Sequence, residues 1–274
     1  MNYLNPGHGK TSRGYLWVYH DPQSGTVYYD WQLGRGHDCL LDFLGYDEES
    51  GAILYQGMLQ CDGYSAYRAL VACVEGIGLG ACLAHMRRKF VEAMEQAPEV
   101  VLPILADIQR LYRIEYWLRG DIPSADCRWL VRRMRSRPLV ESLKQKIDKQ
   151  RATHLPHSKL GEAITYALGR WEEFVRYLDD GRMQIDNNLV ENTIRPAKLG
   201  LKNYLFFGSA EAGAHNALFY TLMANCRAND IDPERYLAEA IRRMTPEATP
   251  EEAAALTPSK LAAVLRSAAE TRVA

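Results

Sequence analysis

Short aromatic and β-branched runs separated by turn residues fill the first part of the chain, a pattern that predicts strands. Tyr15–Tyr19 and Thr26–Trp31 are two such runs, and Asp-Pro-Gln-Ser-Gly between them is typical of a turn. We therefore expect a β-hairpin here. The apolar run Ala52–Leu59 predicts a strand that ends near Asp62, and Gly76–Ala84 predicts one more short strand.

Helical spacing dominates the remainder. His37–Leu44 predicts a short helix with Leu40, Leu41 and Leu44 inward, and from His85 onward apolar residues recur every three or four positions. Breaks are expected near Pro138 and Leu155–Pro156. This order predicts an α/β core interrupted by a helical insertion. We expect a strand-rich first part of the core over 1–98, the basic insertion over 99–180, a helical C-terminal part of the core over 181–244, and a peripheral, partly ordered tail over 245–274.

Composition narrows the class of protein. The 274 residues suffice for one large domain or two small ones. No apolar run approaches the roughly 20 residues of a membrane helix, and the polar start is not a signal peptide. Six scattered cysteines without a disulfide-scaffold spacing favour a reducing cytoplasm.

Basic residues cluster, although the net charge is only −1. Between Arg110 and Arg151 there are 12 Lys/Arg and five Asp/Glu, which gives 12 − 5 = +7. Such a stretch predicts phosphate contacts with DNA, with a solvated helical face as the alternative. The expected contacts are Arg132, Arg133, Arg135 and Arg137, with Trp129 and Met134 as inward anchors.

Two distant carboxylates suggest a metal site. Asp62 follows a predicted strand, and Glu191 opens a predicted helix within Asp-Asn-Asn-Leu-Val-Glu-Asn-Thr-Ile-Arg-Pro (186–196). Magnesium takes oxygen ligands from one or two carboxylates, and two such ions can clamp an in-line phosphoryl transfer. The alternatives are local: Asn188 and Glu191 fit a capping box, and Asp62-Gly63 fits a turn.

Five motifs in order carry a resemblance to a known family. They are Cys-Asp-Gly-Tyr-Ser-Ala-Tyr (61–67), Cys-Leu-Ala-His-Met-Arg-Arg-Lys-Phe (82–90), the 186–196 motif, Leu-Lys-Asn-Tyr-Leu-Phe-Phe-Gly-Ser (201–209) and Asn-Asp-Ile-Asp-Pro-Glu-Arg-Tyr-Leu (229–237). From about Arg13 to about Ile241 the chain resembles transposases of the insertion-sequence-66 family. It departs from the family at Leu83, where Trp is usual, and at Leu201, where a basic residue is usual.

The resemblance implies a ribonuclease H-like α/β fold and an Asp, Asp, Glu triad, in which Asp62 matches the second acid and Glu191 the third. The implied function is metal-dependent cleavage of element ends and strand transfer into target DNA. It implies two Mg²⁺ ions, with Mn²⁺ as a substitute, and a homodimer or larger assembly on DNA. The implied supporting residues are Cys82, His85, Asn187, Asn188 and Arg195, and the further DNA contacts are Arg87, Arg88, Lys198 and Lys202.

Two other functions stay open: a catalytically inactive remnant that only binds DNA, and a ribonuclease H-like nuclease that cuts without joining. The resemblance places the first acid, followed by Glu-Thr-Pro, just before the segment that matches Asn2–Gly7. We therefore expect an N-terminally truncated chain that lacks its first core strand and has negligible strand-transfer activity alone. Asp21 is expected in the hairpin turn and Asp30 in the third strand, away from the expected site, so both are poor substitutes.

Other chemistry is less well supported. Cys82-x-x-His85 supplies two of the four ligands that a structural zinc site needs. His154-x-x-His157 could supply the other two, but nothing else in the sequence supports that pairing. The family instead suggests that Cys82 and His85 buttress the active site, and a buried structural histidine is the alternative for His85. No Gly-x-Ser-x-Gly elbow or Walker A loop is present in the sequence.

Overall fold

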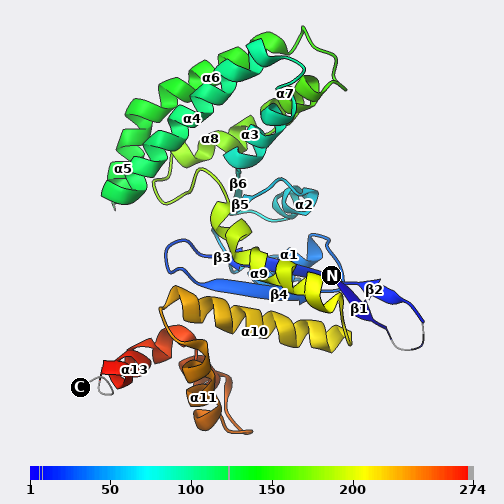
Figure 1. The fold of residues 1–274 in the computed structure, drawn as a ribbon, viewed down its shortest axis with the longest axis vertical. Coiled ribbons are helices and arrows are strands. Elements are labelled where there is room, and N and C mark those ends of the chain that lie inside the picture. The colour runs from blue at the N-terminus through cyan, green and yellow to red at the C-terminus, as the bar shows by residue number, and fades with distance from the viewer. Residues whose placement is uncertain (6, 8, 123, 271–274) are drawn as a thin grey trace. The chain divides into compact units, whose positions relative to one another are not determined.

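The computed structural model describes residues 1–5, 7, 9–122 and 124–270, with side chains described to residue 265, and is a mixed α/β protein with more helix than strand (Figure 1). It divides into two compact units. Unit 1 comprises Met1–Arg35 and Leu189–Ala274, and unit 2 comprises Gly36–Asn188. The mixed α/β class is confirmed, and the strands of the described residues form three small sheets.

The predicted hairpin of unit 1 is present. Strand β3 (Tyr15–His20) pairs antiparallel with β4 (Val27–Gln32), in a register that joins Tyr15 to Gln32 and His20 to Val27. Asp21 stabilises the turn because its carboxylate accepts hydrogen bonds from Gln23 N–H and from Ser24. These bonds, led by that of the Ser24 hydroxyl, lower the pKa of Asp21.

Helix α10 (Ala210–Ala228) lies along β4 and replaces a neighbouring strand (Figure 1). The Asn225 side chain accepts from Val27 N–H at 3.1 Å and donates to Val27 O at 2.6 Å, and Thr221 Oγ1 accepts from Tyr29 N–H at 2.9 Å. These side chains satisfy edge groups that would otherwise be open to another strand. A helix therefore ends the β3–β4 sheet at β4.

The other strands of unit 1 form a sheet of order β2-β1-β7: β1 (Asn2–Leu4) is antiparallel to β2 (Thr11–Arg13) and parallel to β7 (Phe206–Phe207). Part of the segment Asn2–Gly7, at Pro6, lies outside the described residues. Helix α9 (Asn188–Tyr204) precedes β7.

The C-terminal segment is folded. Helices α11 (Pro233–Arg243), α12 (Pro250–Ala255) and α13 (Pro258–Glu270) follow α10. Leu261, Ala262 and Leu265 of α13 are buried against Cys226 and Tyr236. The expected tail therefore forms a small core over its described part, whereas residues 271–274 lie outside the described residues.

Unit 2 contains a parallel pair of strands, β5 (Gly57–Cys61) and β6 (Ile77–Ala81), aligned from Gly57↔Ile77 to Cys61↔Ala81. Helix α2 (Ser65–Cys73) links them, and α1 (Asp38–Leu44) precedes β5. Leu40 and Leu44 are buried, whereas Leu41 is only half-buried.

The predicted strand over Ala52–Leu59 was placed too early, since β5 begins at Gly57. The amides of Leu54 and Tyr55 donate instead to Gly45 O and Leu44 O at the end of α1. These bonds cap a helix and leave the segment unable to join the sheet.

The helical part of unit 2 confirms the predicted run of helices. Its elements are α3 (Leu83–Glu92), α4 (Pro98–Asp121), α5 (Ala125–Val131), a π-helical turn (Arg132–Ser136), α6 (Arg137–Gln150), α7 (Lys159–Gly169), α8 (Trp171–Val175) and a 3₁₀ turn (Arg176–Leu178). α4 packs against α6, and α3 against α7 (Figure 1). Phe90, Ile108, Ile147 and Leu160 are fully buried in their shared core.

The π-helical turn overturns one expectation. Met134 was expected to point inward but is 70% exposed, while Arg132 and Ser136 are buried. A turn with i→i+5 hydrogen bonds shifts the positions of the following side chains around the helix by one residue. A prediction of the buried face from a period of 3.6 residues is therefore wrong here. Each helix in the described part of the chain is too short or too polar to cross a membrane.

Candidate active site

Asp62 stands directly after β5, at the carboxyl end of the parallel strand pair. Its side chain is exposed, and Oδ1 accepts a hydrogen bond from Tyr64 N–H at 3.0 Å. Because β5 and β6 are parallel and in register, Cys82 follows β6 at the same edge. Carboxyl edges of parallel strands are where α/β proteins bind ligands.

Side chains from the helical insertion support the Asp62 turn. Tyr166 Oη donates to Asp62 O at 3.1 Å, and Arg170 Nη2 contacts Cys61 Sγ at 3.8 Å. Gly63 has a φ of +99°, and a Cβ there would lie 1.4 Å from Arg170 Nη1. Only glycine fits both this backbone conformation and this contact.

Cys82 joins two distant segments of unit 2. Its side chain is fully buried at the start of α3, and Sγ accepts from Asn187 N–H at 3.5 Å. Burial raises the pKa of the Cys82 thiol to about 11, so it stays protonated at neutral pH. Cys82 therefore acts as a neutral tether for the 186–196 motif.

Further bonds fix the chain that enters this motif. Gln60 Nε2 donates to Gln184 O at 2.7 Å, and Leu83 N–H donates to Ile185 O at 3.1 Å. Residues 184–187 are thus bound to β5 and to the start of α3, beside the strand edge that carries Asp62.

Asp186 was given no role by the sequence, yet it organises the start of α9. It is 3% exposed, Oδ1 accepts from Asn188 N–H at 3.2 Å, and Oδ2 accepts from the Asn188 side-chain amide at 2.9 Å. Burial, followed by the nearby negative charge of Asp186, raises the pKa of Tyr112. Tyr112 consequently remains a neutral hydroxyl.

An open groove of about 360 Å³ lies beside this anchored segment. Its lining residues are Ala84, Arg87, Arg88, Val91, Tyr112 and Asn188. Arg87 and Arg88 are exposed, and over the described part of the chain neither has an ion-pair partner. Since no described lining residue is acidic, the groove suits an anion such as a backbone phosphate.

Four of the predicted residues belong to unit 1. Glu191 lies in the first turn of α9, half-buried, and Arg195, Lys198 and Lys202 are exposed along the same helix. Asp62 belongs to unit 2 and Glu191 to unit 1. The capping alternative for Glu191 stays open, with Asn188 as the first residue of α9.

Arg132 was expected to contact DNA, and this expectation is wrong. The residue is 1% exposed. Nε and Nη2 donate to the two carboxylate oxygens of Glu115 at 2.9 and 2.7 Å, and the other donors reach the carbonyls of Tyr177, Asp180 and Met183. All five guanidinium N–H groups are used inside unit 2, so none remains for phosphate.

The neighbouring arginines differ from one another. Arg137 is half-buried and donates to Asp179 Oδ1 at 2.6 Å, so its charge is already compensated. Arg133 and Arg135 are exposed and lie over the rings of Trp129 and Trp117, at 5.0 and 5.5 Å from the ring centroids. Of the four predicted contacts, Arg133 and Arg135 are the two whose position suits DNA.

Comparison with known proteins identifies the family. A model of the transposase IS66 family matches residues 1–215, which include both candidate acids. This chain belongs to the IS66 transposase family. The expected resemblance is therefore confirmed.

Curated relatives from Sinorhizobium fredii (strain NBRC 101917 / NGR234) agree with this assignment. The uncharacterized protein y4qI is 36% identical over 255 residues, 88% of this chain and 46% of the relative. The uncharacterized protein y4hP is 30% identical over 259 residues, 86% of this chain and 45% of the relative. The chain thus spans about half the length of the curated relatives it matches. No solved structure gives a significant match.

The donor chemistry at the strand edge of this IS66 family member fits magnesium. Asp62 offers an exposed carboxylate oxygen donor, the ligand type that hard divalent ions prefer. The buried Cys82 thiol accepts the Asn187 amide, a contact that holds the start of the 186–196 motif. The Cys82 contacts support the buttressing role that the family resemblance implied.

Proposed function

We propose that the chain supplies the second Asp and the Glu of Asp-Asp-Glu catalysis in an IS66-family DNA transposase, which cleaves element ends and joins them to target DNA. Asp62 and Glu191 would hold Mg²⁺, with Mn²⁺ able to substitute, in a ribonuclease H-like core. The parallel pair β5/β6, with an acid at its carboxyl end, and the β3–β4 hairpin support such a core.

The tether of residues 184–188 is the observation that carries this proposal. Gln60, Leu83 and Cys82 bind this segment at the strand edge of Asp62, and α9 begins at its last residue. Glu191 follows Asn188 within one helical turn, because a helix rises about 1.5 Å per residue. Chain continuity therefore favours a shared site for the two carboxylates.

Bound metal would activate the attacking oxygen and neutralise charge on the scissile phosphate. The protein side chains have separate tasks in this proposal. Asp62 and Glu191 supply carboxylate oxygens, Arg87 and Arg88 bind the DNA backbone in their groove, and Asp186 fixes the start of α9. His85, in the first turn of α3, is proposed to contact the phosphate.

Work on both DNA ends requires more than one copy of the site, so we propose a homodimer or larger assembly on DNA. The matched relatives are about twice as long as this chain. We therefore also propose, for the whole protein, that it recognises terminal repeats and acts on target DNA.

The test uses the full reading frame that contains this chain and a plasmid that carries the element ends. Asp62→Asn and Glu191→Gln should each abolish Mg²⁺-dependent cleavage while DNA binding persists. Gln preserves most of a capping interaction but supplies a weak metal ligand. Near-normal cleavage by Glu191→Gln would establish the capping role, and DNA binding without cleavage by the unaltered protein would indicate an inactive remnant.

A further inference from the structure

The main chain at Asp62 is held by a side chain from about 100 residues away. Tyr166, on α7, donates from its hydroxyl to the carbonyl oxygen of Asp62 at 3.1 Å. The Tyr166 ring is fixed in turn, because it packs edge-on against Phe174 with centroids 6.0 Å apart. A fixed donor on the helical insertion thus restrains the residue proposed to bind metal.

Arg170 supports the same turn. It is 6% exposed, its guanidinium lies 5.6 Å from the centroid of the Tyr166 ring, and Nη1 donates to the Tyr166 hydroxyl at 3.4 Å. Nη2 reaches Cys61 Sγ, and the guanidinium occupies the space that a side chain at position 63 would need. The Asp62–Gly63 turn therefore packs against the buried guanidinium of Arg170, which leaves no space for Gly63 to move toward Arg170.

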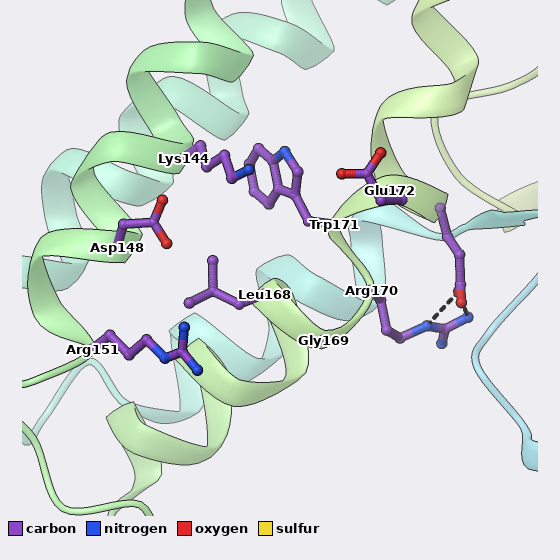
Figure 2. Close-up of a pocket in the computed structure, with 9 residues that line it drawn as sticks. Lys144, Asp148, Arg151, Leu168, Gly169, Arg170, Trp171 and Glu172 are labelled. Atoms are coloured by element: carbon purple, nitrogen blue, oxygen red, sulfur yellow. Dashed lines mark hydrogen bonds and ion pairs between the residues drawn. The ribbon is translucent and has the colours of Figure 1, made fainter.

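An ion-pair network holds Arg170 in this place. Nε and Nη2 donate to Glu173 Oε2 at 2.8 and 2.6 Å, bonds drawn as dashed lines in Figure 2. Arg68 donates to the other oxygen of Glu173 at 3.0 Å and to Gly169 O at 2.9 Å. The network joins α2, which follows the Asp62 turn, to α7 and α8 of the insertion.

We propose that Tyr166 and Arg170 are positioning residues for Asp62, so that the helical insertion sets the geometry of the metal-binding carboxylate. This inference rests on the proposed function, since it gives Asp62 the role of a metal ligand. Both residues act through the Asp62–Gly63 turn, which they contact directly. Their effect is to restrict the Asp62–Gly63 backbone to the conformation in which the carboxylate faces the site, which lowers the entropic cost of binding metal.

The test measures Mn²⁺ binding to the intact chain by electron paramagnetic resonance of free Mn²⁺, which requires no catalysis. Tyr166→Phe removes one hydroxyl from an otherwise unchanged ring. We expect its dissociation constant for the Asp62-dependent Mn²⁺ to rise about fivefold, as for the loss of one hydrogen bond. Tyr116→Phe is the matched control, because Tyr116 is 83% exposed on α4 of the same unit.

Arg170→Lys is the second variant, with Arg113→Lys on the exposed face of α4 as its control. Lysine keeps the positive charge, but its single nitrogen cannot replace the several guanidinium nitrogens through which arginine makes its contacts. We therefore again expect the dissociation constant for Mn²⁺ to rise at least fivefold. Circular dichroism before each titration establishes that the variant is folded. In the full reading frame, the Mg²⁺ concentration for half-maximal cleavage should rise while the dissociation constant for DNA stays unchanged.

The results separate this inference from the proposal beneath it. If Asp62→Asn abolishes Mn²⁺ binding but Tyr166→Phe and Arg170→Lys bind like their controls, the positioning role is refuted and the metal site stands. If Asp62→Asn itself leaves Mn²⁺ binding unchanged, the metal role of Asp62 fails and the inference falls with it.

Discussion

Replacing Arg132 by methionine should destabilise unit 2 strongly, because the residue is part of the fold and not of a DNA surface. The substitution keeps most of the side-chain length but leaves the carboxylate of Glu115, itself 1% exposed, without its partner. The carbonyls of Tyr177, Asp180 and Met183 lose their donors as well.

The size of the effect follows from this burial. Removing one partner of a buried ion pair costs about 3–5 kcal/mol, a large part of a typical stability of about 5–15 kcal/mol. With a urea dependence of about 2 kcal/mol per molar, the unfolding midpoint should fall by about 2 M. Arg133→Met is the control, since an exposed arginine over a tryptophan contributes only about 0.5–1 kcal/mol.

Urea unfolding of the intact chain, followed by circular dichroism, measures both variants. The double variant Arg132→Met/Glu115→Met should recover much of the loss, because it leaves no buried charge unpaired. The reasoning would be refuted if Arg132→Met and Arg133→Met differed by less than about 1 kcal/mol, or if the double variant were no more stable than Arg132→Met.

Further outcomes follow from the same contacts. The double variant Arg133→Gln/Arg135→Gln should weaken the salt dependence of DNA binding. In a plot of log binding constant against log salt concentration, the slope should fall by about 0.9 for each phosphate that the protein no longer neutralises. An unchanged slope in this salt titration would mean that the two arginines bind no phosphate. At pH 8 a thiol reagent should label exposed Cys73 and Cys127 but spare Cys82 in the folded chain; mass spectrometry detects the sites, and rapid labelling of Cys82 would disprove its burial. Since the folded-state pKa of Cys82 is raised from about 9 to about 11, its contribution to stability should be complete below pH 9 and lost as pH rises toward 11. Urea unfolding across that range checks this, and a midpoint that rises with pH would contradict it.

Local features of the fold were predictable from sequence. The β3–β4 hairpin depends on residues next to one another, above all on Asp21, whose side chain bonds within its own turn. The break at Leu155–Pro156, between α6 and α7, also follows from local chemistry, since proline lacks an amide donor. The break expected near Pro138 is absent, because α5, the π-helical turn and α6 form one continuous helical run in which Pro138 lies in the first turn of α6.

Features that depend on tertiary partners were not predictable. Arg132 lies in a run of arginines that looks like a DNA surface, and only the π-helical turn reveals that it faces Glu115. Tyr166 and Arg170 lie some 100 residues from Asp62, in and directly after helix α7, whose sequence pattern suggests only packing. The one local sign was Gly63, since a glycine after a candidate acid permits a close approach from another segment.

The candidate site was predictable only in part, because some of its features are local and others depend on tertiary contacts. Asp62 at a strand end and Glu191 in the first turn of a helix follow from local pattern and from the family motifs, and both placements are confirmed. The role of Asp186 was not predicted, because an acidic residue before a helix usually remains solvated. Here the carboxylate is buried and accepts hydrogen bonds from the backbone and side-chain amides of Asn188. Whether Asp62 and Glu191 share one metal stays a prediction.

Fe²⁺-directed cleavage of the polypeptide tests that claim most directly. Fe²⁺ takes the place of Mg²⁺ in oxygen-ligand sites, and with peroxide and ascorbate it releases hydroxyl radicals that cut the backbone within a few ångströms of the ion. With the intact chain, the account predicts two groups of fragments, with ends near residue 62 and near residue 191. Both groups should disappear together in Asp62→Asn and be suppressed by excess Mg²⁺. Cuts near only one of the two residues, or cuts near both that Asp62→Asn leaves unchanged, would contradict a shared metal site.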